Sequence, residues 1–314
     1  MKILVYGSLN IDLVFAVDHI VRPGETISSG GLEKSAGGKG ANQAAALAKA
    51  GMEVFMAGKI GADGRFLLDL LESYGINTER VATYSGATGQ ALIQLDRNKQ
   101  NSIILYAGGN GEIQIDEIDG VLDFFGSGDA VLLQNEIPHI GTIMEKARAR
   151  EMKIFLNPSP YDEKIGTLPL NLVDVFFVNE IEAAALAAES SPPEGMPLSV
   201  IMDRLTARFP CAEIILTAGR DGAYYGFETA REKGEIIELP VEDTTGAGDT
   251  FTGYYIAARE KQFTVAESLN LACKAASIAV SRKGAMQSIP FREEVFPGAS
   301  SKPDTLTAKK KENR

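Results

Sequence analysis

The stretch DTTGAGDTFTG, residues 243–253, decides the fold. It predicts a glycine-rich turn that opens a helix, with the carboxylate of Asp249 inside the first helical turn. A helix N-terminus presents unpaired backbone N–H groups and a partial positive charge, so it can hold an anion. A carboxylate beside a bound phosphate is repelled by it, unless the carboxylate accepts the proton of the attacking nucleophile. The stretch therefore predicts an anion hole with an adjacent base, which is the machinery of phosphoryl transfer to an alcohol. Taken alone, an ordinary glycine-rich loop with an acidic N-terminal residue is the commoner explanation.

A second glycine-rich segment, AGGKGANQ at residues 36–43, runs directly into an alanine-rich helix. It is not a Walker A loop, because Lys39 is followed by Gly40 rather than by Ser or Thr. No G-x-G-x-x-G follows the first strand, so a dinucleotide site is poorly supported. Backbone amides with Lys39 and Asn42 at a helix start suit a ligand rich in hydroxyl groups. A helix start that needs close packing is the alternative.

Polar residues follow the first apolar strand, Ile3–Tyr6, in the segment GSLNID at residues 7–12. Ligands of α/β sheets bind at such strand ends. Asn10 and Asp12 alternate with apolar residues, so a strand would present both side chains on one face. Two hydrogen-bonding groups on one face suit a vicinal diol, and a solvated strand end is the alternative.

Short apolar segments alternate with amphipathic ones along most of the chain. This pattern predicts an α/β fold with a mainly parallel sheet covered by helices on both faces. The expected strands are Lys2–Tyr6, Val54–Gly58, Ala130–Gln134, Lys153–Asn157, Val175–Val178 and Glu213–Thr217. The expected helices are Gly40–Ala50, Phe66–Tyr74, Ile140–Glu151, Glu180–Ala188 and Ser199–Arg208. Two antiparallel pairs interrupt the rhythm, Leu13–Val17 with Thr26–Glu33 and Gln90–Asp96 with Ser102–Tyr106.

Composition excludes several classes of function. The net charge of −11 over 314 residues makes a poor partner for nucleic acid or an anionic membrane. The only histidines, His19 and His139, nearly exclude a zinc site or a histidine-based triad. Two distant cysteines and the lack of a secretory signal or long apolar run lead us to expect a cytoplasmic protein.

The motifs together resemble the ribokinase family of phosphofructokinase-B-like carbohydrate kinases. Both glycine-rich segments take part in the resemblance, with the GSLNID segment and further matches in the same order. These are RPGET at residues 22–26, LNPSP at 156–160, NEIE at 179–182, TAG at 217–219 and RKGA at 282–285. The resemblance implies a ribokinase-like kinase domain over residues 1–297. Residues 298–314 are expected to form a disordered basic tail.

The resemblance also implies the roles of site residues. Asp249 would deprotonate the primary hydroxyl of the sugar, and the amides of Gly246, Ala247 and Gly248 would hold the transferring phosphoryl group. The sugar hydroxyls would be held by Asn10, Asp12, Gly38, Lys39, Gly40, Asn42 and Glu136. The inserted strands, about residues 12–34 and 90–107, would form a small β-sheet lid over the sugar that also builds a homodimer. Without the resemblance, Glu136 is equally well explained as an acidic loop residue after a strand.

ATP, Mg²⁺ and K⁺ are the implied cofactors. The nucleotide would be contacted by Asn179, Thr217, Ala218, Gly219, Arg220, Asp221, Gly222, Gly248 and Cys273. Glu182 matches the acidic position that orders Mg²⁺ through water, although an acid at a helix start is also favourable by dipole alone. The potassium pattern falls on Asp243, Thr245, Ala279, Arg282, Gly284 and Ser288, whose carbonyl-rich oxygen set suits a large monovalent ion. Cys273 departs from the family, in which a polar or imidazole side chain lies near the adenine.

Three classes of function remain open on the sequence. A sugar kinase is favoured, with D-ribose as the expected substrate because Asn10, Asp12 and residues 38–42 most resemble the ribose-specific members. A nucleoside, fructose or sugar-acid kinase on the same scaffold is the second class. A non-catalytic carbohydrate sensor is the third, and the retained Asp249 argues against it.

Overall fold

The computed structural model describes residues 1–187 and 196–298. The tail expected from residue 298 lies outside this range except for Gly298. Within the described residues, nine strands form the main sheet in the order β13-β12-β11-β10-β9-β8-β1-β4-β5. The pairs from β5 to β11 are parallel, and β12 and β13 add an antiparallel edge. The predicted α/β class with a mainly parallel sheet is confirmed.

The main sheet contains all six strands expected from the sequence and three that were not, β5, β12 and β13. The bounds are β1 Lys2–Tyr6, β4 Glu53–Ile60, β5 Asn77–Thr83, β8 Ala130–Gln134, β9 Lys153–Asn157, β10 Val175–Asn179, β11 Glu213–Thr217, β12 Ala223–Phe227 and β13 Ala230–Gly234. β5 and β13 are the two edge strands of the sheet, and β12 lies beside β13. Edge strands carry polar residues, as β13 does with its sequence AREKG, so hydrophobic patterning does not reveal them.

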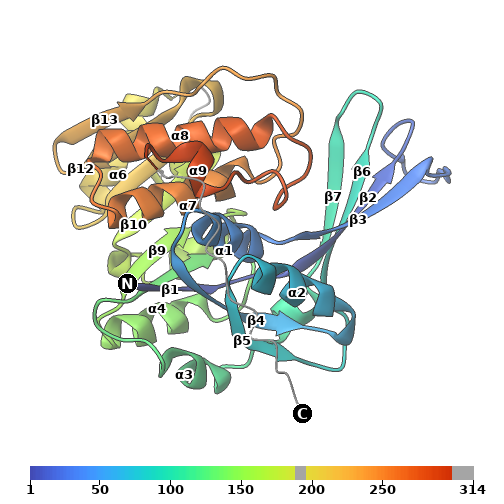
Figure 1. Cartoon of the computed structure of the whole chain (residues 1–314), viewed down its shortest axis with the longest axis horizontal. Coiled ribbons are helices and arrows are strands. Elements are labelled where there is room, and N and C mark those ends of the chain that lie inside the picture. The colour runs from blue at the N-terminus through green and yellow to red at the C-terminus, as the bar shows by residue number, and fades with distance from the viewer. Residues whose placement is uncertain (188–195, 299–314) are drawn as a thin grey trace, which may run out of the picture.

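Helices cover both faces of the main sheet (Figure 1). One apolar cluster contains α1 (Lys39–Lys49), α2 (Arg65–Ser73), α7 (Ala247–Glu260), α8 (Val265–Val280) and α9 (Arg292–Val295). The other contains α3 (Glu117–Leu122), α4 (Ile140–Ala149), α5 (Glu180–Ala187) and α6 (Leu198–Arg208). Side chains of β1 alternate between the two clusters, with Val5 in the first and Leu4 in the second. This is why the central strands are apolar at nearly every position.

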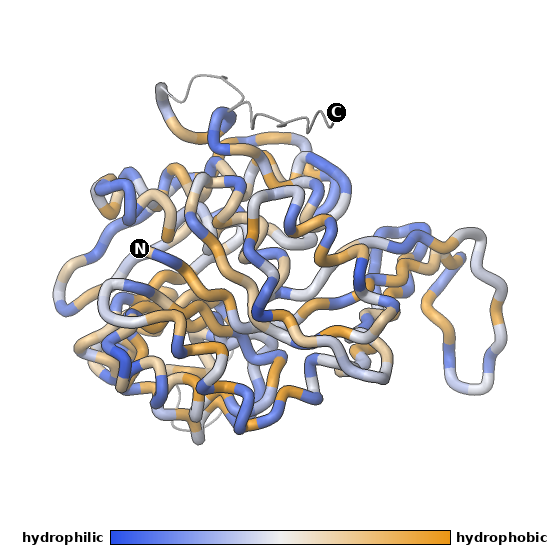
Figure 2. Tube along the Cα trace, turned by 60° about the horizontal axis from the view of Figure 1, so that its bottom comes forward, coloured by the Kyte–Doolittle hydropathy of each residue, from blue (hydrophilic) through white to orange (hydrophobic). Residues whose placement is uncertain are grey.

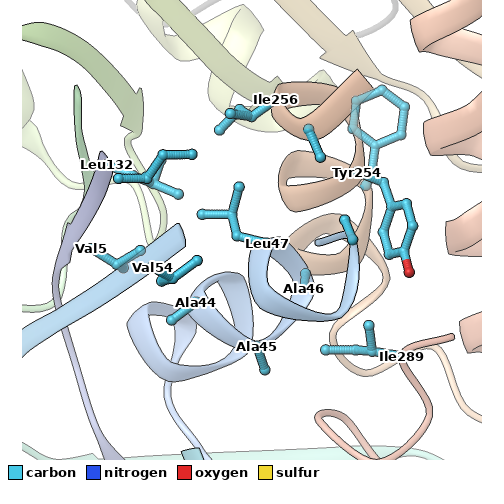
Figure 3. Close-up of a cluster of buried hydrophobic side chains, with 14 of the residues drawn as sticks. Val5, Ala44, Ala45, Ala46, Leu47, Val54, Leu132, Tyr254, Ile256 and Ile289 are labelled. Carbon is cyan, nitrogen blue, oxygen red and sulfur yellow. The ribbon is translucent and has the colours of Figure 1, made fainter. Parts of the chain in front are cut away.

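Helices α1 and α7 lie side by side and bring their N-termini together (Figure 1). Gly253 of α7 makes the close approach possible, because a Cβ there would lie 2.5 Å from the Cβ of Ala46 and 2.8 Å from the backbone N of Leu47. Figure 3 shows this part of α1 packed among Val5 and Leu132 of the sheet and Ile256 of α7. The two glycine-rich segments, about 200 residues apart in the sequence, therefore open onto one place.

A second sheet of four strands projects from the body of the molecule (Figures 1 and 2). Its order is β3-β2-β6-β7, with β2 Asn10–Ala16, β3 Gly31–Gly37, β6 Gly89–Leu95 and β7 Asn101–Tyr106. The outer pairs are antiparallel, and β2 pairs with β6 in parallel. The predicted small sheet at these segments is confirmed.

One strand of the small sheet was predicted at the wrong position. Residues 26–30 are not in a strand, and β3 runs from Gly31 to Gly37 instead of from Thr26 to Glu33. The pairing of Asn10 with Gly37 extends both strands toward the main sheet, where Ala36 and Gly37 are buried. The small residues of the glycine-rich segment fit this crowded site, and a hydrophobic pattern does not register them as strand.

Candidate active site

Asp249 lies in the first turn of α7 and is only 7% exposed. Its Oδ2 accepts a hydrogen bond from Nδ2 of Asn42 at 3.1 Å, and its Oδ1 accepts one from Nε2 of Gln43 at 2.9 Å. Both donors lie near the start of α1. The carboxylate therefore has a fixed direction, and each oxygen keeps a further lone pair for a ligand.

The start of α7 leaves room for a ligand beside this carboxylate. Gly246 is the N-cap residue with a φ of 75°, and its carbonyl accepts a hydrogen bond from the N–H of Thr250 at 2.8 Å. Gly248 is exposed, and a Cβ built on it would meet nothing within 4 Å. Of the three predicted anion-hole amides, that of Ala247 already donates to the carbonyl of Thr244 at 3.3 Å. The open, positive end of a helix is suited to a phosphoryl group.

Asn10 and Asp12 lie two residues apart in β2, so their side chains share one face of the small sheet. A Cβ on Gly37 would lie 2.1 Å from Oδ2 of Asp12, so a side chain at position 37 would displace this carboxylate. Burial, followed by the nearby charges of Glu136 and Asp249, raises the pKa of Asp12 from its ordinary 3.8 to about 7. Asn10 is 6% exposed, and its Oδ1 accepts a hydrogen bond from Nδ2 of Asn110 at 2.7 Å.

Glu136 is tied to the start of α1. Its Oε2 accepts hydrogen bonds from the hydroxyl of Ser8 and, at 3.1 Å, from the backbone N–H of Lys39. The Ser8 hydroxyl in turn accepts a hydrogen bond from the N–H of Gly40 at 3.3 Å. Burial is the largest cause of the raised pKa of Glu136, which these hydrogen bonds and Lys39 partly oppose.

Lys39 carries the positive charge at the centre of the site. Burial alone would lower its pKa, but the carboxylates of Asp249, Glu136 and Glu182 together raise it. Its ammonium group therefore stays protonated at neutral pH between acids contributed by different elements. This arrangement could bind both a polyol, through the acids, and an anion, through Lys39 and the helix N-terminus.

The side chain of Asn42 has a free acceptor that suits a hydroxyl-rich ligand. The Oδ1 of Asn42 is buried and has no hydrogen-bond partner among the described residues. A buried acceptor without a donor is costly, and a ligand hydroxyl would supply the missing donor. The predicted sugar-binding residues therefore lie together, from β2, α1 and the segment after β8.

The predicted nucleotide residues lie at the carboxyl ends of neighbouring strands. Asn179 ends β10 and is in register with Thr217, which ends β11. Residues 219–221 form a short 3-10 helix directly after β11. Cys273 is different, because it is 2% exposed within the first apolar cluster and burial raises its pKa to about 12.

Glu182 is 4% exposed and forms a reciprocal pair with Asn179. The backbone N–H of Asn179 donates to Oε2 of Glu182 at 3.0 Å, and the N–H of Glu182 donates to Oδ1 of Asn179 at 2.9 Å. This pair caps α5, so Glu182 has a structural task whether or not it contacts Mg²⁺. Residues 1–187 and 196–298 contain no group of three or more His, Cys, Asp or Glu suited to hold a metal ion.

The residues predicted to bind K⁺ converge beside the start of α7. Oδ1 of Asp243 accepts hydrogen bonds from the N–H and hydroxyl of Thr245, and Oδ2 accepts one from the N–H of Gly284 at 3.0 Å. The hydroxyl of Ser288 donates to the carbonyl of Ala285 at 2.7 Å. These hydrogen bonds hold the loops of Thr245 and Gly284 around the carboxylate of Asp243. The side chain of Arg282 points elsewhere, since it pairs with Glu294.

Three residues of the site had no role in the sequence analysis: Ser8, Gln43 and Asn110. Ser8 and Gln43 stand inside quoted motifs, but their function depends on partners far along the chain. Asn110 sits in a 3-10 segment, Gly108–Glu112, and also accepts a hydrogen bond from the N–H of Leu9 at 2.9 Å. Its role follows only from the packing of this segment against β4 and β6, which brings Asn110 to Asn10.

Comparison with known proteins agrees with this geometry. The family model described as pfkB family carbohydrate kinase matches residues 1–292. Ribokinase of Staphylococcus aureus (strain COL) is 32% identical over 306 residues, covering 94% of this chain and 98% of that protein.

None of the helices in the described residues is long and apolar enough to cross a membrane.

Two solved structures are similar over nearly their whole length. Ribokinase from Cryptococcus neoformans var. grubii serotype A in complex with ADP has a TM-score of 0.81 and 33% identity, covering 94% of this chain and 98% of that one. Arabidopsis thaliana ribokinase complexed with ribose and ATP has a TM-score of 0.82 and 29% identity, with 94% and 97% covered. The chain belongs to the pfkB family of carbohydrate kinases.

Proposed function

We propose that this protein transfers the γ-phosphate of ATP to the primary hydroxyl of a sugar, with D-ribose as substrate and ribose 5-phosphate as product. One observation carries the proposal most directly. The carboxylate of Asp249 is buried and held by two amides at the open N-terminus of α7, directly beside the polar start of α1. A base and an anion site side by side are what transfer to an alcohol requires.

In the proposed reaction, Asp249 accepts the proton of the sugar hydroxyl as its oxygen attacks the γ-phosphorus. The backbone amides of the Gly246–Gly248 turn stabilise charge on the transferring group. Gly248 allows the phosphoryl group to approach the helix, because no side chain occupies the space above it. The ammonium of Lys39 is close enough to Asp249 to interact with its charge and would also attract the negatively charged phosphoryl group.

The sugar would be held on the side of Asp249 opposite the proposed anion hole. Asp12 and Glu136 offer carboxylate acceptors, and Asn10 and Asn42 offer amide groups, from elements fixed against one another. The amides of Gly38, Lys39 and Gly40 line the same start of α1. A site with paired acceptors discriminates against molecules that lack the matching hydroxyls.

ATP would lie along the carboxyl ends of β10 and β11, with Asn179 near the phosphates and residues 217–222 near the nucleoside. Mg²⁺, which neutralises phosphate charge when bound, would be ordered through water by Glu182. K⁺ would be held by the loops around Asp243, with Thr245, Ala279, Arg282, Gly284 and Ser288 supplying mainly carbonyl oxygens. Because the Asp243 loop leads into α7, such a cation would order the anion hole without contacting substrate.

The small sheet would act as a lid over the sugar and as a homodimer interface, with residues 1–297 acting as one kinase domain in the cytoplasm. β7 supports this because four consecutive apolar residues, Ile103 to Tyr106, are each more than half exposed. Figure 2 shows this sheet standing away from the body, with apolar positions along its strands. Exposed apolar strands are costly unless another surface covers them.

The experiment that tests the function is an ADP-release assay with Mg·ATP against D-ribose, D-fructose, a sugar acid and adenosine. The highest kcat/KM is expected for D-ribose. A higher value for one of the other substrates would move the assignment to another kinase of the same family. ADP release with none of them would favour the carbohydrate sensor.

A further inference from the structure

Gln43 connects the carboxylate of Asp249 to the main sheet. Its side chain is fully buried, and its Nε2 donates both to Oδ1 of Asp249 at 2.9 Å and to Oδ1 of Asn157 at 3.0 Å. Its Oε1 accepts a hydrogen bond from Nε2 of Gln134 at 2.7 Å. One amide thus joins α1, α7 and the ends of β8 and β9.

The partners of Gln43 determine which way its amide faces. Because Gln134 presents an N–H to it, the oxygen of Gln43 must point toward β8 and its NH₂ group toward Asp249. Asn157 is held in turn, since its Nδ2 donates to the carbonyl of Phe177 at 2.8 Å. The backbone carbonyl of Phe177 thus fixes the direction of the Asn157 amide, and the oxygen of Asn157 in turn requires the NH₂ group of Gln43.

A neutral donor suits the task of holding a base. An N–H group orients the carboxylate and satisfies one of its lone pairs while leaving its negative charge in place. A lysine or arginine at the same point would stabilise the charged carboxylate further and make it a weaker proton acceptor. Apolar side chains would leave the buried oxygen without a partner.

We propose that Gln43 is a positioning residue that aims the carboxylate of Asp249 at the attacking hydroxyl. The inference rests on the proposed function, in which Asp249 is the base. It adds a requirement that this function does not contain, namely that the rate depends on the amide chain behind the base. Gln43 touches neither substrate in this account and acts only through Asp249.

The test is the replacement Gln43→Glu, with Gln134→Glu as the matched control. Both variants put a carboxyl group into the same buried chain, but only Gln43→Glu puts it against Asp249. In Gln134→Glu, burial favours the neutral acid, whose O–H can still donate to Oε1 of Gln43 and leave the direction of that amide unchanged. Two carboxylates in contact share a proton, so the acid limb of the kcat–pH profile should move up by about one pH unit or more. The other charged groups facing this point, Lys39, Asp12 and Glu136, are unchanged in both variants.

Expected for Gln43→Glu is a fall in kcat of about 10- to 100-fold at neutral pH, because small misplacement of a reacting group is costly. KM for the sugar should change by less than about threefold, and the Gln134→Glu profile should keep the wild-type acid limb. Equal shifts in the two variants, or none in either, would overturn the inference. Gln43→Leu, which removes the donor without adding charge, should also lower kcat with little change in KM. The Gln43→Leu variant provides the test if Gln43→Glu fails to fold. An unchanged kcat in Gln43→Leu would also overturn the inference.

A third variant separates this inference from the proposed function. If Asp249→Asn keeps its turnover, the proposed base is wrong and the positioning role falls with it. If Asp249→Asn is inactive while Gln43→Leu and Gln43→Glu behave as wild type, only the positioning role is wrong.

Discussion

Asn42 and Asp249 are separated by 207 residues in sequence, and Nδ2 of Asn42 donates a 3.1 Å hydrogen bond to Oδ2 of Asp249. This contact joins the starts of two helices, one carrying the proposed sugar-binding amides and the other the proposed anion hole. The packing of α1 on α7 thus fixes the proposed proton acceptor and the two proposed substrate sites relative to one another.

The proposed sugar site should depend on pH through Asp12. Its pKa in the folded protein is raised to about 7, so Asp12 gains its negative charge, and accepts hydroxyl protons best, above neutral pH. We expect kcat/KM for the sugar to rise with pH up to about 7 and then level off. Asp12→Asn should remove this inflection and raise KM. An unchanged inflection in that variant would assign it to another group.

The same shift predicts a change in stability with pH. Between about pH 4 and pH 7 the folded protein binds a proton at Asp12 that the unfolded chain has lost, so the free energy of unfolding should fall as pH rises through that window. Urea unfolding at several pH values, for wild type and Asp12→Asn, measures this. A steeper fall in the variant than in the wild type would contradict the assignment.

Potassium should raise the turnover of the enzyme at saturating Mg·ATP, and sodium should do so less. The smaller ion would fit less well into a loop whose oxygens are fixed by Asp243 and Gly284. Asp243→Ala should abolish the difference between the two salts, because the loop loses the carboxylate that gathers it. Equal rates of the wild type in potassium, sodium and tetramethylammonium chloride would remove the cation site from the account.

Close packing of α1 on α7 should be sensitive to a single methyl group. Gly253→Ala would place a Cβ 2.5 Å from that of Ala46, and overpacking of this kind typically costs about 1–3 kcal/mol. Gly120→Ala in α3 is the control, because nothing lies within 4 Å of its new Cβ. We expect a lower Tm for the first and an unchanged or higher Tm for the second. Equal Tm values would show that the helices can move apart at no cost.

The small sheet should carry the contacts between two copies of the chain. Ile104 is 61% exposed in the outer strand β7, and Ile104→Asp would place a charge within the proposed interface. Light scattering after size exclusion should give a dimer mass for the wild type and a monomer for the variant. A monomeric wild type at micromolar concentration, or a variant that remains dimeric, would remove this interface.

Much of the fold could be predicted because the central strands are apolar at nearly every position. The strand β8, Ala130–Gln134, is buried throughout and was recognised from its composition alone. The edge strands were missed, since β13 is polar and mostly exposed. The position of β3 was wrong for a related reason. The strand ends in Gly37, which lies against Asp12 of β2, and the need for a small residue there comes from this neighbouring strand rather than from a local pattern.

The residue types of the site could also be predicted, but their connections could not. Asp249, Asn42 and Lys39 stand in motifs that suggest their chemistry without the structure. Gln43 orients Asp249 and Asn110 orients Asn10, each across about 100 residues or more of sequence, so local patterning does not identify these partners. Cys273 shows the opposite case, because its burial in the core follows from helix packing rather than from a motif.

The central claim is that Asp249 accepts the proton of the sugar hydroxyl. Asp249→Asn keeps the shape of the side chain but removes its capacity as a base. The direct measurement is kcat with D-ribose and Mg·ATP, taken together with the Kd of ATP and the Tm of the variant. The account predicts a fall in kcat of at least about 10²-fold, within or beyond the range typical of losing a general base, while ATP still binds. Turnover close to that of the wild type with a lowered Tm would contradict it, because Asp249 would then serve only the start of α7.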